Sequence, residues 1–225
     1  MWTGSLTELL PIAVAIAANP PAVIAVVLML ASRESRQSAT WFVLGWLAGL
    51  LVVGAGALLI GDAVGIEDGP SLLGASVRAL MGVTLVGSAL RKWLGGSPAG
   101  GAEEMPAWLQ TVKGLSPVRS FGSAALFAGL NPKTLALNIA GAIVISEAVA
   151  GRTDRSVTLV VFVIVSSLTL IAPLAYGLAA PRHSQGFFGR IQLWLVSNNR
   201  PITAAVLGVL GAMVTFSAVR DLLAM

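Results

Sequence analysis

The sequence contains no cysteine, one histidine and few charged residues. Only 11% of its 225 residues are Asp, Glu, Lys or Arg, whereas a soluble domain has about 25%. The absence of cysteine excludes disulfide bonds, thiolate metal sites and dithiol redox chemistry. A single histidine, with no cluster of His, Asp and Glu, argues against a metalloenzyme or a histidine-based triad. We therefore expect that the protein is not an enzyme and that it holds no metal or other cofactor.

Apolar residues are abundant instead. They make up 56% of the chain, and the mean hydropathy is +0.87. Each apolar run is long enough to cross a hydrocarbon core of about 30 Å. The runs cover residues 6–30, 40–60, 71–93, 121–148, 156–179 and 201–222. This pattern predicts an all-α polytopic membrane protein with six transmembrane helices.

The distribution of Lys and Arg predicts how these helices are oriented. The loops after helices 1, 3 and 5 hold nine basic residues, whereas the opposite side holds Arg152, Arg155 and Arg220. Since basic loops stay in the cytoplasm, both termini should face outward from the plasma membrane. The net charge of +4 forms no patch, so we expect no nucleic-acid partner.

Similar segments recur in the two halves of the chain. Asn19-Pro20 and Asn131-Pro132 lie 112 residues apart, and weaker Ser-x-Thr and Ser-Ala-x-Arg matches follow in the same order. With three helices in each half, the two halves must enter the membrane in opposite orientations. The sequence therefore predicts two inverted three-helix repeats, over residues 1–94 and 121–225. Residues 95–120 would form a cytoplasmic amphipathic linker.

The two Asn-Pro pairs should break helices 1 and 4. Proline removes a backbone donor and clashes with the preceding turn. A break inside a membrane is tolerated only where it faces protein or a wet cavity. Asn19, Pro20, Asn131 and Pro132 are therefore candidate binding residues, because the following half-helices direct their positive ends toward one central site. The alternative is that both pairs are packing kinks.

Lys133 is a cation deep in an apolar run, where it should contact an anion, a carbonyl or water. A substrate anion is one such partner, and snorkelling is the alternative. Thr134 and Asn138 continue a polar stripe that either lines the site or joins helices. Arg78 is a second candidate anion contact, with snorkelling toward an acidic loop as the alternative.

Two further patterns favour structural roles. Gly45, Gly49 and Gly54 favour close helix packing. A kinked, hydrogen-bonding helix 5 is indicated by Ser166, Ser167, Thr169 and Pro173.

Parts of the chain resemble the actinobacterial Gap/Sap family of glycopeptidolipid-addressing and sulfolipid-addressing proteins. The resemblance lies in segments 18–30 and 42–49, in Trp108 and segment 115–117, and in Gly129-Leu130-Asn131-Pro132-Lys133. It implies membership of the lysine-exporter-type superfamily. It also implies transport of a cell-envelope glycolipid or similar amphiphile across the plasma membrane, beside larger lipid transporters.

The combined hypothesis is a transporter that exports or flips a lipid with a polar, anionic headgroup. Its partners would be this lipid and the bilayer, with a larger lipid-export transporter and a second copy of the chain left open. Two alternatives remain: an exporter of a small soluble solute such as an amino acid or ion, and a non-transporting accessory subunit of a lipid-export complex.

Overall fold

The computed structural model describes residues 2–31, 35–64, 87, 90, 114–180, 188 and 191. Within these residues the chain forms helices and no strand, so the all-α prediction is confirmed for this part of the sequence. The helices are α1 (Trp2–Ala17), α2 (Pro20–Ala31), α3 (Arg36–Val64), α6 (Pro117–Leu130), α7 (Pro132–Ala148), α8 (Arg152–Ser166) and α9 (Leu168–Ala179).

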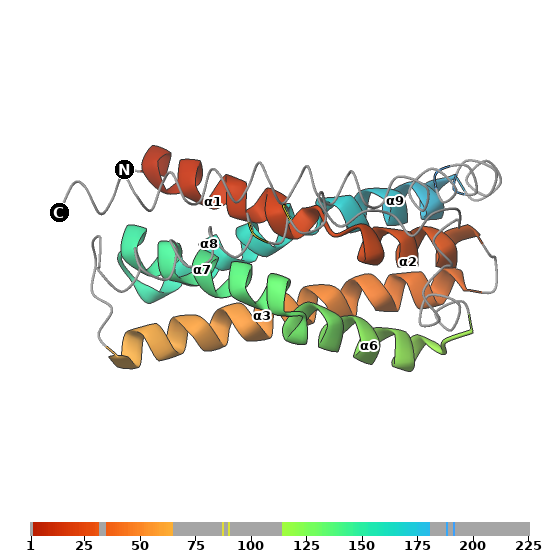
Figure 1. The fold of residues 1–225 in the computed structure, drawn as a ribbon, viewed down its shortest axis with the longest axis horizontal. Coiled ribbons are helices and arrows are strands. Elements are labelled where there is room, and N and C mark those ends of the chain that lie inside the picture. The colour runs from red at the N-terminus through yellow and green to blue at the C-terminus, as the bar shows by residue number, and fades with distance from the viewer. Residues whose placement is uncertain are drawn as a thin grey trace.

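These helices run roughly along the long axis of the molecule (Figure 1). Helices α1, α7 and α8 lie toward one end of the molecule, and α2, α6 and α9 lie toward the other end (Figure 1). Helix α3 extends along both of these groups (Figure 1). Helix α3 packs against α6, α7, α2 and α8, and α1 packs against α7 and α8. The predicted runs 71–93 and 201–222 fall almost wholly outside the described residues. The six-helix inverted repeat therefore stays a prediction.

By length and composition, one described helical segment is able to cross a membrane alone, Arg36–Gly61. Its 26 residues span about 39 Å at 1.5 Å per residue, which exceeds a hydrocarbon core of about 30 Å. Three further pairs qualify only if each bent pair is one span. These are Leu9–Ala17 with Pro20–Ala31, bent by 49°, Pro117–Leu130 with Pro132–Ala148, bent by 67°, and Arg152–Ser166 with Leu168–Ala179, bent by 65°.

Two of these bends lie at the Asn-Pro pairs, as the sequence predicts. Helix α2 begins at Pro20 and α7 begins at Pro132, so each proline occupies the first helical position, where its missing N–H leaves no hydrogen bond unmade. Asn131 has an extended backbone, with φ −65° and ψ 118°, because a following proline disfavours the helical conformation. The predicted breaks in helices 1 and 4 are confirmed.

The third bend separates α8 from α9 at Ser167. The sequence predicts a kink in this run, and the structure places it at the serines, whereas Pro173 lies inside α9. The Ser166 hydroxyl donates to the carbonyl of Phe162 (2.7 Å), and a bond of this kind to the preceding turn often bends a helix. The Ser167 amide donates to the Ile164 carbonyl (3.0 Å), three residues back, which tightens the end of α8.

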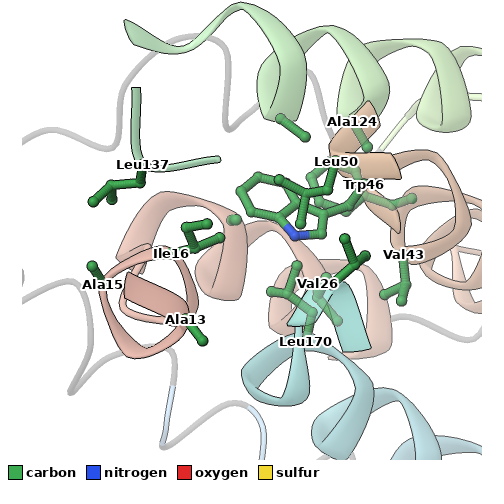
Figure 2. Packing of buried hydrophobic residues seen from close by; sticks show 14 of the residues in the cluster. Ala13, Ala15, Ile16, Val26, Val43, Trp46, Leu50, Ala124, Leu137 and Leu170 are labelled. Atoms are coloured by element: carbon green, nitrogen blue, oxygen red, sulfur yellow. The ribbon is translucent and has the colours of Figure 1, made fainter. Parts of the chain in front are cut away.

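Apolar side chains fill the interior and also cover much of the outside. Trp46 lies at the centre of the cluster drawn in Figure 2, among residues of α1, α2, α3, α6, α7 and α9. On the outside, Val52 of α3 is 72% exposed and Val118 of α6 is 77% exposed. Helices that are apolar on all sides suit a lipid environment, which supports the membrane assignment.

Helices α3 and α6 run parallel and in close contact. A Cβ atom on Gly45 would collide with the carbonyl oxygen of Phe121, and one on Gly49 would lie 2.5 Å from that of Ala125. Residue numbers increase in the same direction along α3 and α6, so the two helices start at the same end of the bundle. The prediction that these glycines permit close packing is confirmed.

The start of α6 lies inside the predicted linker. Pro117 is its first residue, four positions before the predicted run, and the extended Ser116 precedes it. The Ser38 hydroxyl donates to the Leu115 carbonyl (2.8 Å), which joins the start of α3 to the segment before α6. Arg36 and Arg119, both predicted to be cytoplasmic, therefore lie at the same end of the bundle.

Candidate functional site

Asn19 lies at the α1–α2 break and is buried. Its side-chain oxygen accepts a hydrogen bond from the Ala22 amide (3.5 Å), which helps to satisfy the first turn of α2. Its side-chain nitrogen donates to the Thr134 hydroxyl (3.4 Å). Asn19 thus caps its own half-helix and contacts α7, which belongs to the other half of the chain.

Asn131 has the corresponding role at the α6–α7 break. Its side-chain oxygen accepts from the amides of Lys133 (3.1 Å) and Thr134 (3.4 Å), the first free donors of α7. The two asparagines, 112 residues apart, therefore each cap the half-helix that follows them. This shared role agrees with the repeat that the sequence predicts.

Lys133 connects the two breaks. Its ammonium group donates to the carbonyl oxygen of Ala18 (3.0 Å), just past the end of α1. The sequence predicts an anion, a carbonyl or water as the partner, and the carbonyl is one that the structure provides. A hydrogen bond from a charged donor is about twice as strong as a neutral one, so this contact helps to hold the two Asn-Pro segments together.

The α8–α9 break reaches the same end of α1. The Thr169 hydroxyl donates to the Ala17 carbonyl (2.7 Å), next to the carbonyl that accepts from Lys133. The last carbonyls of a helix lack partners within it, so α7 and α9 each satisfy one of them here. All three breaks meet at this level. The sequence predicts a kinked, hydrogen-bonding helix from Thr169 and its neighbours, and this bond confirms that prediction for Thr169.

Thr134 and Asn138 both connect helices. Thr134 contacts Asn19, and the Asn138 side-chain nitrogen donates to the Leu50 carbonyl of α3 (2.8 Å). Both side chains are buried. In this structure the polar stripe joins helices, the second of the two predicted readings. Arg78 lies outside the described residues.

The ammonium group of Lys133 places a positive charge at the breaks. The N-terminal ends of α2 and α7 add positive potential there, and the carbonyls at the C-terminal ends of α1 and α6 add negative potential. Among residues whose side chains the structure describes, the carboxylates are Glu147, near the end of α7, and Asp154, in the first turn of α8. Glu147 is fourteen residues from Lys133, about 21 Å along α7.

Comparisons with curated proteins and with solved structures return no match. A family comparison does match, over residues 9–220 and hence nearly the whole chain, and its description is Sap, sulfolipid-1-addressing protein. The matched region contains both Asn-Pro pairs and all three breaks. The protein therefore belongs to the Sap, sulfolipid-1-addressing protein family, which indicates a role in lipid addressing or export.

Proposed function

We propose that this protein is an integral membrane transporter that exports or flips a cell-envelope lipid with an anionic, carbohydrate-containing headgroup. The observation that carries this proposal is the meeting of the two Asn-Pro breaks through Lys133. A charged donor, two helix N-termini and several side-chain amides and hydroxyls gather midway along apolar helices. Such a set suits the headgroup, while the acyl chains remain in the surrounding bilayer.

The contact between Lys133 and Ala18 provides a switch. An anionic headgroup competes with the Ala18 carbonyl for the ammonium group, because both are hydrogen-bond acceptors and the anion is the stronger partner. Loss of this contact weakens the connection between the α1–α2 segment and α7, which the bond from Asn19 to Thr134 also maintains. The two halves of the chain then move relative to each other about the Asn-Pro breaks and expose the headgroup to the opposite side.

The proposal includes the full predicted topology. The chain crosses the plasma membrane six times as two inverted repeats, with both termini outside, as in the lysine-exporter-type superfamily that the family resemblance implies. The partners are the lipid and the bilayer, with a larger lipid-export transporter as a further component in cells.

Purified protein in liposomes tests this function. The probes are a fluorescent sulfated galactosylceramide, its unsulfated form and phosphatidylcholine, and the measurement is loss of fluorescence to an impermeant quencher. We expect the sulfated lipid to cross the bilayer faster than in protein-free liposomes and faster than the two control lipids, whose headgroups have no net charge. Movement of an entrapped labelled amino acid, with no lipid movement, would identify a solute exporter. No movement of any probe, with loss of lipid export in cells lacking the protein, would identify an accessory subunit.

A second experiment tests the topology, using the absence of cysteine. Single cysteines are introduced by Gln37→Cys, at the start of α3, and Thr153→Cys, at the start of α8, since both positions are exposed. In right-side-out vesicles we expect an impermeant maleimide to label Thr153→Cys, and to label Gln37→Cys only after permeabilisation. The reverse pattern would invert the topology. Labelling of both from one side would contradict an α3 that crosses the membrane.

A further inference from the structure

Ser167 lies at the third break, which the proposed function does not use. Its side chain is 0% exposed, and its hydroxyl has no hydrogen-bond partner among the described residues. It is also the N-cap residue of α9, yet it makes no side-chain capping bond. The adjacent Ser166 differs, because its hydroxyl donates to the Phe162 carbonyl (2.7 Å). Buried polar groups in proteins nearly always make hydrogen bonds, so a buried hydroxyl without one at a helix break is a candidate ligand-binding group.

The position of Ser167 places it beside the site. Two residues further on, the Thr169 hydroxyl donates to the Ala17 carbonyl (2.7 Å). The next carbonyl of the chain, that of Ala18, accepts from Lys133 (3.0 Å). The start of α9 and the ammonium group of Lys133 therefore lie against the same end of α1.

Trp46 supplies a second buried donor without a partner in the described part of the chain. Its indole ring is 1% exposed, and its nitrogen has no acceptor among the described residues. An indole N–H only donates, so an oxygen acceptor must come from elsewhere. Figure 2 shows this nitrogen on the side of the ring nearest Val26 and Leu170. The Leu170 amide donates to the Ser167 carbonyl (2.9 Å), so Leu170 belongs to the first turn of α9, and Trp46 and Leu170 belong to the same buried cluster.

We propose that Ser167 and Trp46 donate hydrogen bonds to oxygen atoms of the lipid headgroup, and so form a second, uncharged part of the site beside Lys133. This inference rests on the proposed function. Both donors are neutral and buried, so they suit hydroxyl or ether oxygens better than a full charge. Lys133 holds the anionic group, whereas Ser167 and Trp46 set the position of the uncharged part of the same headgroup.

The test compares matched variants by binding. Ser167→Ala removes the unbonded hydroxyl, and Ser166→Ala removes its bonded neighbour as the control. Trp46→Phe removes the indole N–H, and Trp41→Phe is its control on an exposed tryptophan of the same helix. Each protein is titrated with sulfated galactosylceramide in mixed micelles, and the apparent affinity is taken from the rise in melting temperature. We expect Ser167→Ala and Trp46→Phe each to weaken binding about 3- to 10-fold, as the loss of one neutral hydrogen bond predicts, and the controls to bind as the unchanged protein does.

The folding readout separates this role from a structural one. Ser167→Ala should not lower the melting temperature without lipid, since the hydroxyl that it removes makes no bond within the described structure. Equal affinities of Ser167→Ala and Ser166→Ala would overturn the inference and leave the transporter proposal standing. The same holds if the unchanged protein moves the lipid in liposomes but is not stabilised by it. If the lipid stabilises the protein but does not cross the bilayer, the transport proposal is rejected and the binding site is retained. If the lipid neither stabilises the protein nor crosses the bilayer, the proposed function and the inference about Ser167 and Trp46 are both rejected.

Discussion

Replacing Lys133 with glutamine should reduce transport of the anionic lipid about 10- to 100-fold while leaving the protein folded. Glutamine keeps an N–H donor on a side chain one atom shorter than that of lysine, but it has no charge to hold an anion. A hydrogen bond to a charged group contributes about 1.5–3 kcal/mol, and this range sets the expected loss. The liposome assay with sulfated galactosylceramide measures the rate, and the melting temperature in detergent reports the fold.

Two further variants separate the charge of Lys133 from its structural contact. Lys133→Arg keeps a positive donor and should retain most of the transport, whereas Lys133→Ala should lose both transport and stability, because the Ala18 carbonyl then loses its donor. Transport by Lys133→Gln at the unchanged rate would show that Lys133 only holds the two Asn-Pro segments together. The headgroup site would then have to lie elsewhere.

Replacing Gly45 with alanine should destabilise the protein by about 3 kcal/mol, the upper part of the range for overpacking a well-packed interior. The added methyl group would collide with the Phe121 carbonyl oxygen, which is backbone and cannot rotate away. Helices α3 and α6 would have to separate, and their separation would disturb the break at Asn131, one residue beyond α6. Denaturant or thermal unfolding of the detergent-solubilised protein measures the effect.

The control for Gly45 lies on the same helix. Nothing approaches within 4 Å of a Cβ atom built on Gly56, so Gly56→Ala should change stability little, or raise it by up to about 1 kcal/mol through helix propensity. Gly49→Ala should resemble Gly45→Ala, since its Cβ would lie 2.5 Å from the Ala125 carbonyl oxygen. Equal stability of Gly45→Ala and Gly56→Ala would contradict the close approach of α3 and α6.

Much of the local structure could be predicted because its causes are local. Proline at 20 and 132 lacks a backbone donor, so the helices had to end beside Asn19 and Asn131 whatever packs around them. The same holds for the asparagine caps, which bond to amides two or three residues away. The apolar runs and scarce charges required a membrane protein, because such a surface is unfavourable in water.

The partners of these residues were not predictable in the same way. Lys133 and Thr134 contact Ala18 and Asn19 across 115 residues of sequence, and Thr169 contacts Ala17 across 152. No local pattern specifies which carbonyl a buried lysine will reach, since this depends on how the helices cross. Ser166 and Ser167 look alike in the sequence, yet the Ser166 hydroxyl is bonded and that of Ser167 has no partner in the part of the chain that the structure describes.

The sequence by itself thus determined the environment of the protein, the positions of the two proline breaks and the deep cation beside one of them. These properties follow from transfer free energies and from the covalent structure of proline, which act residue by residue. Only the tertiary structure decided that a third break joins the other two, that Lys133 bonds to the end of α1, and that Ser167 and Trp46 have no hydrogen-bond partner among the described residues. Each of these depends on distances between separate helices, and such distances are set by side-chain packing across the whole bundle.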